Sequence, residues 1–325
     1  MQSINLDSPE ARRPSGEPVG EAPGAWAVRG LDWRHAARAA PWPQFAVVLL
    51  ATAIPLIIME AVGHPRIRPF AGGDATLSYP YRPNSVPAWA AVVGPLLAWA
   101  ATAVAVEGCV RKRVNGCATQ AAAAVLYHSV DVACAILVTT LATEATKLAV
   151  GYPRPYFLAA CAPADGSTVP AAGAACSPTG VVKTLDSARV SFPSGHASSS
   201  ACIATFTAAY ALWAALVTPA PRRAGAWGGG YNAAAAADGA RSASLAWALL
   251  VLVMPWAIAA SRIVDNRHHP ADVVAGLLLG GVVALLFFAR SLAGRLALPR
   301  YDAKARVPVF ESGGGEGAGL TEARV

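Results

Sequence analysis

Three short stretches between residues 147 and 272 contain the residue types that a phosphate-handling pocket requires. Together they supply three permanent cations, two histidines and one carboxylate. Transfer of a phosphoryl group to a protein nucleophile needs such a set: cations that hold the phosphate oxygens, a nucleophile, a group that orients it and a proton donor. The stretches are Lys147-x6-Arg154-Pro155, Pro193-Ser194-Gly195-His196 and Ser261-Arg262-x5-His268-x3-Asp272.

The first stretch can bring two cations to one point. Lys147 ends an apolar run, and Gly151 with Pro153 is expected to stop that helix before Arg154. An ammonium supplies a compact charge, whereas a guanidinium can bind two phosphate oxygens as a fork. Glu144, one turn earlier, either orients Lys147 or neutralises a charge near the interface. Basic residues at span ends also reach the interface without any ligand, so this stretch alone is a weak signal.

The second stretch predicts a turn directly before another apolar run. The free backbone N–H groups of a helix start bind phosphate. Ser194 can cap this helix and contact the phosphate, while Gly195 lets the backbone approach it closely. His196 can then donate a proton to the departing alkoxide. A capped helix start with a surface histidine explains this stretch about equally well.

The third stretch decides the interpretation. Pro270 is expected to open the last helix, which puts His268 before the helix and Asp272 in its first turn. At this spacing the carboxylate can accept a hydrogen bond from one imidazole nitrogen and leave the other free to attack phosphorus. Arg262 ends the preceding apolar run and can reach the same phosphate. A helix-dipole role would explain Asp272 but not its coincidence with the other groups.

A metal site is the natural rival for the histidines and the carboxylate. Charge argues against it, because Lys147, Arg154 and Arg262 would repel a divalent cation and attract a phosphate dianion. The residues therefore predict chemistry with no metal and no cofactor. The rival ligand set would be His196, His268, His269 and Asp272.

The composition predicts a membrane protein. Of the 325 residues, 55% are hydrophobic and only 14% are charged, against about 25% charged in an average soluble domain. Six apolar runs can be placed whose lengths suit the roughly 20 residues that span a bilayer, so the expected fold class is all-α, a polytopic membrane bundle of six transmembrane helices. The runs lie at about 44–63, 87–108, 122–149, 197–217, 244–260 and 271–292.

The expected organisation is a six-span catalytic membrane domain at 44–292 between a disordered cytosolic tail at 1–43 and a flexible cytosolic tail at 293–325. The first tail lacks the apolar stretch of a secretory signal, so the first span is expected to remain in the mature protein. Most of the 26 Lys and Arg residues lie on the side of the termini. The positive-inside rule then predicts cytosolic termini, with the three stretches facing the lumen or the exterior.

The formal net charge of +7 does not indicate nucleic acid. The excess lies in the tails and short loops where membrane topology requires it, and aromatic residues do not interleave with it as base stacking would need. Each of the three stretches lies where an apolar run begins or ends, so the pocket is expected at a membrane surface and its substrate is expected to be a lipid phosphate. Anionic membrane lipid is the expected further partner, and homo-oligomerisation is left open.

Two pairs inside the apolar runs and one pair in an outer loop carry further expectations. Gly276 and Gly280 form a small-x3-small pair that indicates close helix packing. The second pair, His128 and Asp131, predicts a polar contact between helices rather than a second site. The third pair, Cys161 and Cys176, lies in the long loop at 150–192, where a disulfide and two free thiols are equally consistent with the sequence.

Taken together, the three stretches resemble the type-2 phosphatidic acid phosphatase superfamily, and within it the six-span integral membrane lipid phosphate phosphatases. The order of spans and loops is similar over about residues 44–292. The resemblance implies a metal-independent phosphatase whose site faces away from the cytosol. Typical substrates would be phosphatidate, lysophosphatidate, sphingosine 1-phosphate, ceramide 1-phosphate and diacylglycerol pyrophosphate.

The resemblance also implies roles for individual residues. His268 would attack the phosphate and form a phosphohistidine, Asp272 would orient it, and His196 would protonate the leaving lipid. One departure is Pro153, where the family more often carries another residue; we expect it to stiffen the turn without abolishing activity. The residues that would hold the phosphate are Lys147, Arg154, Ser194, Gly195 and Arg262.

Four alternatives remain at the level of sequence. A lipid phosphotransferase of the same superfamily would pass the phosphoryl headgroup to an alcohol, although such relatives tend to lack the first stretch. Vanadate-dependent haloperoxidases share the constellation but are soluble. A catalytically silent lipid-phosphate binding scaffold would be expected to lack some of these residues, and a transporter is suggested only by the span count.

Overall fold

The computed structural model describes residues 32–114, 118–163, 176–217, 229–296, 300–302 and 307–309. Of the two expected tails, residues 1–31 and 310–325 lie outside the described residues. Within the described residues, six helices are long and apolar enough to cross a membrane, which confirms the expected fold class. They are α2 (Trp42–Val62), α3 (Ala90–Val114), α4 (Ala118–Val150), α6 (Gly195–Val217), α7 (Gly229–Val264) and α8 (Pro270–Leu296).

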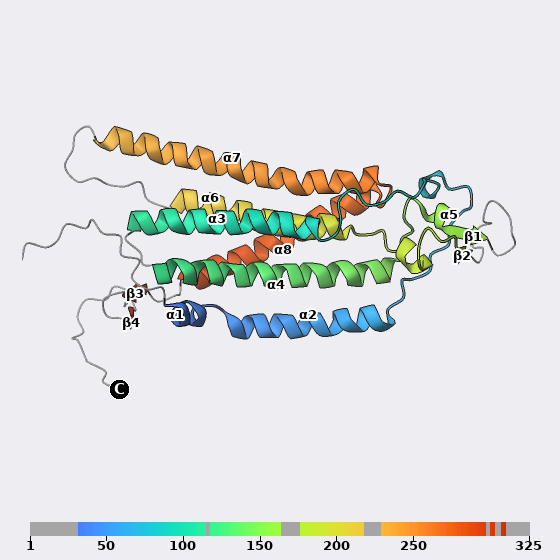
Figure 1. The fold of residues 1–325 in the computed structure, drawn as a ribbon, viewed down its shortest axis with the longest axis horizontal. Coiled ribbons are helices and arrows are strands. Elements are labelled where there is room, and N and C mark those ends of the chain that lie inside the picture. The colour runs from blue at the N-terminus through green and yellow to red at the C-terminus, as the bar shows by residue number, and fades with distance from the viewer. Residues whose placement is uncertain are drawn as a thin grey trace, which may run out of the picture.

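The shorter elements lie at the two ends of the bundle, as Figure 1 shows. At one end lie α5 (Phe157–Ala160) and an antiparallel pair of strands, β1 (Cys161–Pro163) and β2 (Cys176–Pro178). We call this the pocket end: α2, α4 and α7 finish there, and α3, α6 and α8 begin there. The opposite end carries α1 (Trp33–Arg38) and the antiparallel pair β3 (Arg300–Asp302) and β4 (Val307–Val309). Two 3-10 turns complete the pocket end, Ala75–Leu77 and Leu185–Ala188.

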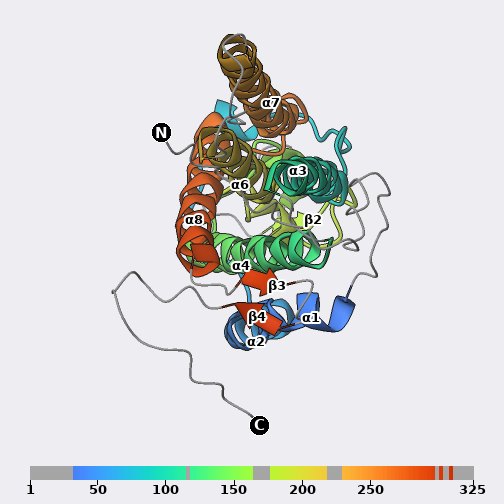
Figure 2. The ribbon, with the colours of Figure 1, turned by 90° about the vertical axis from the view of Figure 1, so that its left-hand side faces the viewer.

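Helix α6 is the centre of the bundle. It packs against α3, α4, α7 and α8, and the view along the bundle shows it with α3 on one side and α8 on the other (Figure 2). Helix α2 packs mainly on α4 at one edge, where isoleucines such as Ile54 and Ile57 remain exposed. An apolar outer face on a membrane helix needs no protein partner, because lipid covers it.

Helix α7 begins earlier than the apolar run at 244–260 predicts. It starts at Gly229 and includes the alanine-rich segment at 233–237. Alanine has the highest helix propensity of any residue, so the helix extends beyond its membrane-crossing part. The hydrophobicity of the sequence marks only the part that lipid can cover.

A close helix contact joins α6 and α8, as the Gly276–Gly280 pair predicts. A Cβ atom on Gly276 would lie 2.6 Å from the carbonyl oxygen of Ser194, and one on Gly280 would collide with the carbonyl oxygen of Ser198. The two glycines therefore let the backbones of α6 and α8 touch. This contact places Ser194, at the start of α6, beside the first turn of α8.

The polar pair within α4 contacts α8, so the interhelical contact predicted for it is confirmed. Nδ1 of His128 lies 2.6 Å from Oγ of Ser291. The Asp131 carboxylate accepts hydrogen bonds from Arg290 at 2.5 Å and from Gln44 at 3.2 Å. Buried polar groups in a membrane bundle require such partners. The network joins α2, α4 and α8.

A disulfide between Cys161 and Cys176 closes the β1–β2 pair. The sequence left a disulfide and two free thiols open, and the structure contains the disulfide. Beside it, Phe157 packs in a small apolar cluster with Phe70 and Leu77 of the loop between α2 and α3. The loop after α4 and the loop after α2 are thereby joined at the pocket end.

Candidate active site

A polar cavity of about 340 Å³ lies at the pocket end. Its wall includes six of the eight site residues predicted from the sequence. The other two, Ser194 and Asp272, are buried beside it, and the Ser194 backbone N–H donates to the Asp272 carbonyl oxygen at 2.9 Å. The six lining residues are Lys147, Arg154, Gly195, His196, Arg262 and His268.

The end of α4 turns the first two cations into the cavity. Gly151 adopts a φ of 57°, and a Cβ atom there would collide with the carbonyl oxygen of Arg66. A left-handed glycine is a common way to end a helix. The chain after it is fixed by backbone hydrogen bonds of 2.9 Å from Arg154 to Ala188 and from Ser191 to Tyr152. These bonds hold the Arg154 loop against the segment that leads into α6.

Lys147 does not stand alone in the cavity. Its ammonium donates to Oε1 of Glu144 at 2.6 Å, one turn earlier in α4. This pair is the orienting contact that the sequence left open. Gly195 lies directly opposite, since a Cβ atom on it would be 3.2 Å from Nζ of Lys147. The start of α6 therefore approaches the ammonium closely, as a glycine permits.

Ser194 differs from the sequence expectation. Its Oγ is buried and has no hydrogen-bond partner, so the side chain does not cap α6. The hydroxyl is instead an unused donor and acceptor next to the cavity. A buried hydroxyl without a partner costs free energy, and a phosphate oxygen would supply the missing acceptor.

The imidazole of His268 is held in one tautomer, although not by the predicted partner. Nδ1 lies 2.7 Å from the carbonyl oxygen of Ser191 and 3.8 Å from Oδ2 of Asp272. A carbonyl oxygen only accepts, so Nδ1 carries the proton and Nε2 keeps its lone pair in the neutral ring. The hydrogen bond predicted between His268 and Asp272 is therefore not formed. Nδ1 donates to the backbone instead, because the loop before α6 lies closer to it than the carboxylate does.

Asp272 organises the groups around His268. Its Oδ2 accepts hydrogen bonds from the Ser191 hydroxyl at 2.5 Å and from the His269 backbone N–H at 2.8 Å. Nδ1 of His269 lies 3.3 Å from the same oxygen, while the ring of His269 packs on Tyr152 with centroids 4.9 Å apart. The carboxylate thus fixes Ser191, whose carbonyl fixes His268. At 3.8 Å it also faces the imidazole as a counter-charge.

Burial keeps His268 neutral. Its side chain is 5% exposed, and loss of solvation lowers its pKa from 6.5 to about 4, with Arg154 acting in the same direction. A protonated imidazole has no lone pair for attack, whereas a neutral one does. The environment therefore favours the nucleophilic form near neutral pH.

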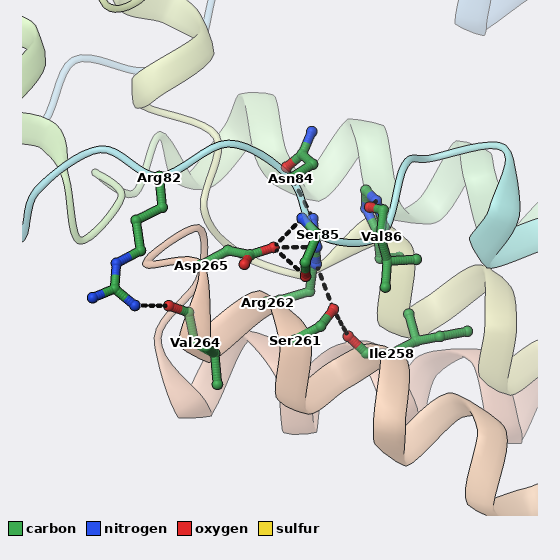
Figure 3. Close-up of polar contacts among 10 residues, drawn as sticks. Arg82, Asn84, Ser85, Val86, Ile258, Ser261, Arg262, Val264 and Asp265 are labelled. Carbon is green, nitrogen blue, oxygen red and sulfur yellow. Dashed lines mark hydrogen bonds and ion pairs between the residues drawn. The ribbon is translucent and has the colours of Figure 1, made fainter.

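His196 and Arg262 are held by the loop between α2 and α3, which the sequence motifs did not indicate. Nε2 of His196 lies 3.2 Å from the carbonyl oxygen of Val86, so this nitrogen carries a proton. Nη1 of Arg262 donates to Oδ1 of Asn84 at 3.0 Å, and Figure 3 shows the loop lying along the end of α7.

Asp265 completes the support of Arg262. Its Oδ2 accepts from Nη2 of Arg262 at 2.5 Å and from the backbone N–H and hydroxyl of Ser85 at 2.8 and 2.9 Å, as the dashed lines of Figure 3 show. Arg82 adds a bond from Nη1 to the Val264 carbonyl oxygen at 3.1 Å. Sequence reasoning missed this support. Asp265 lies three residues after Arg262 inside the third stretch, a spacing that permits an ion pair within one helix. For the loop residues the available signal was the cluster of short polar residues after the Tyr-Pro-Tyr segment at 79–81.

The fold and the cavity define a multi-pass membrane protein with a cationic, histidine-containing pocket at one end of its bundle. The family model that matches, described as the PAP2 superfamily, covers residues 129–293, and the chain belongs to this superfamily. This confirms the resemblance inferred from the three stretches. No solved structure matches the chain.

Curated relatives carry the names of lipid phosphatases. "Lipid phosphate phosphatase 1" of Arabidopsis thaliana is 30% identical over 237 residues, which are 70% of this chain and 63% of that protein. "Phospholipid phosphatase 2" of Rattus norvegicus is 29% identical over 262 residues, 73% of this chain and 81% of that protein. A Drosophila melanogaster relative is 27% identical, over 74% of this chain and 65% of its own length. The chain therefore spans less than two thirds of the plant and fly relatives.

Proposed function

We propose that this protein is a lipid phosphate phosphatase. It hydrolyses phosphomonoesters such as phosphatidate, lysophosphatidate or sphingosine 1-phosphate through a phosphohistidine on His268, without a metal ion. The observation that carries the proposal is the buried imidazole with Nδ1 bound to the Ser191 carbonyl oxygen, in the wall of a cavity that also contains a lysine and three arginines. The names of the relatives support the substrate class.

The first step transfers the phosphoryl group. Lys147, Arg154 and Arg262 hold the phosphate oxygens while Nε2 of His268 attacks phosphorus. The bond between phosphorus and the lipid oxygen breaks, and its electron pair goes to the departing alkoxide. The positive charge that develops on the imidazole is stabilised by the Ser191 carbonyl oxygen and the Asp272 carboxylate.

His196 supplies the proton for the departing alkoxide. A bound phosphate dianion favours the imidazolium form of a neighbouring histidine. In that form Nε2–H remains on the Val86 carbonyl oxygen, and Nδ1–H is the proton that can be donated. The neutral His196 then accepts a proton from water, which attacks the phosphohistidine and releases orthophosphate.

The cations replace a metal ion in this proposal. Mg²⁺ neutralises developing charge on phosphate oxygens in many phosphoryl-transfer enzymes. Here the lysine and arginines of the cavity wall would do so. Their positive field would also oppose the entry of a divalent cation.

The orientation in the membrane is part of the proposal. Both termini would be cytosolic, and the pocket end would face the lumen or the exterior. The distribution of Lys and Arg in the sequence supports this orientation. Labelling of single cysteines by an impermeant reagent in sealed vesicles tests this orientation. The cysteine of an Asp186→Cys variant should react only with reagent added on the lumenal or exterior side of the membrane.

The decisive experiment measures orthophosphate release from a panel of lipid phosphates by the purified full chain. We expect His268→Ala to lose nearly all turnover and to lose the acid-labile, base-stable phosphoprotein that the parent forms. His196→Ala should lose less as the leaving group becomes more acidic. His64→Ala, an exposed loop histidine paired with Asp186, is the matched control and should retain activity.

The outcome also separates the alternatives. Free orthophosphate means hydrolysis, whereas a new phosphodiester means transfer to an alcohol by a lipid phosphotransferase. Binding of a lipid phosphate without release of either product would indicate a silent scaffold. Full activity of His268→Ala would end the phosphohistidine mechanism.

A further inference from the structure

The cations of the cavity differ in how far they are already neutralised. Lys147 is paired with Glu144 at 2.6 Å, and Arg262 with Asp265 at 2.5 Å. Arg154 and Arg267 also line the cavity, yet within the described residues neither guanidinium contacts a carboxylate. The positive charge available to an incoming anion is therefore concentrated on these two arginines. Arg267 was not among the phosphate-binding residues predicted from the motifs.

Arg267 is buried among aromatic rings. Arg267 is 8% exposed, and its guanidinium carbon lies 4.4 Å from the ring centroid of Tyr81 and 5.3 Å from that of Tyr156. Cation–π contacts hold a guanidinium in place without using its N–H donors. Its Nε is buried without a hydrogen-bond partner. The group is thus fixed in the cavity wall with unused donors.

Arg154 and Arg267 lie against the same tyrosine. The guanidinium carbon of Arg154 is 6.0 Å from the Tyr156 centroid, and its Nη1 is 3.4 Å from the Tyr156 hydroxyl. Nε of Arg154 is likewise buried and unpaired. Two neighbouring guanidinia without counter-charges repel each other, so an arrangement that places both in the wall of one cavity, each with a buried Nε, is stabilised by an anion between them. Guanidinia match the oxygen geometry of phosphate especially well.

We propose that Arg267 is a phosphate-binding residue, a fourth cationic contact that acts with Arg154 on the substrate's phosphate group. This inference rests on the proposed function, because it places the same phosphate in the same cavity. The loop residue Tyr81 then has a defined role: it positions Arg267 and so connects the loop between α2 and α3 to substrate binding. The competing interpretation is that Arg267 only fastens this loop to Tyr156.

The test compares Arg267→Gln with a matched control, Arg189→Gln. Arg189 is also a buried arginine, 7% exposed, with its guanidinium 4.8 Å from the ring of Phe157 and Nη1 unpaired. It lies at the same end of the molecule but outside the cavity wall. Both variants remove one buried charge from an aromatic stack, so general loss of stability affects both.

The readout is binding of inorganic phosphate to the full chain in detergent, measured without turnover by the concentration-dependent rise of the melting temperature. Loss of one charge-assisted contact is expected to weaken phosphate binding by about 10- to 100-fold in Arg267→Gln. Arg189→Gln should stay within about threefold of the parent. Arg267→Lys, which keeps the charge but loses the planar fork, should lie between Gln and the parent, and it serves as the test if the Gln variant does not fold.

The outcomes separate this inference from the proposed function. If the parent hydrolyses lipid phosphates but Arg267→Gln and Arg267→Lys bind phosphate as tightly as Arg189→Gln, Arg267 only holds the loop in place. The inference about Arg267 is then wrong, while the proposed function stands. If the parent neither binds phosphate nor releases it from lipid, both fail. An equal loss of kcat/KM for substrates with different lipid tails would support a contact with the phosphate itself.

Discussion

Replacing Asp265 by asparagine tests how the fold holds a buried cation in the cavity wall. The side chains of Arg262 and Asp265 are 1% and 7% exposed, so solvent does not screen the pair. Asp265→Asn keeps an acceptor oxygen but leaves the guanidinium without its counter-charge. Removing one partner of a buried ion pair costs about 3–5 kcal/mol, and because Asn still accepts a hydrogen bond we expect about 3 kcal/mol, the lower end of that range.

The assay is reversible unfolding of the purified full chain, in a buffer without phosphate because a bound anion could replace the lost carboxylate. The double variant Arg262→Met/Asp265→Asn supplies the control. It removes the charge together with its partner and should therefore be more stable than Asp265→Asn alone. Ser85→Ala, which removes one hydroxyl donor to Asp265, should cost less than Asp265→Asn. The reasoning is refuted if the single Asp265 variant is as stable as the parent, or less destabilised than the double variant.

Three further predictions concern the nucleophile, the metal and the helix packing. Because burial lowers the pKa of His268 to about 4, its imidazole should stay neutral from pH 7 to pH 5. The free energy of unfolding should fall as the pH drops from 6.5 toward 4, because in this range the unfolded chain binds a proton that the folded chain does not. An NMR titration of labelled histidine that gave His268 a midpoint near 6.5 would contradict this. Turnover should survive EDTA, and loss of activity that a divalent ion restores would show that the cations do not suffice. Gly280→Ala should destabilise the bundle by about 1–3 kcal/mol through overpacking, whereas Gly281→Ala, whose Cβ would lie 3.8 Å from Oγ1 of Thr205, should be nearly neutral in the same unfolding assay.

The loop between α2 and α3 links the cavity to the small apolar cluster of Phe70, Leu77 and Phe157 at the pocket end. Asn84 contacts Arg262, Val86 contacts His196, and Tyr81 packs on Arg267. Three groups of the cavity wall thus depend on one loop. Substitutions in this loop should change kinetic constants together rather than one at a time, because each alters the position of the whole segment.

The sequence by itself determined the number of membrane helices and the end at which the site gathers. Hydrocarbon imposes a minimum length on each apolar run, and a chain that crosses six times returns every second loop to the same side. The three stretches follow spans three and five or precede spans four and six, so they meet at one end. Gly276 and Gly280 likewise marked a close helix contact, because only small side chains permit one.

The tertiary structure decided which groups pair within the site. His268 hydrogen-bonds the Ser191 carbonyl oxygen rather than Asp272, Cys161 is bonded to Cys176, and Arg262 is held by Asn84. Such choices depend on small differences in distance: Nδ1 of His268 lies 2.7 Å from the Ser191 carbonyl oxygen and 3.8 Å from Oδ2 of Asp272. Apolar patterns and residue spacing are local properties, whereas a hydrogen-bond partner is selected by which oxygen the packed loops bring nearest.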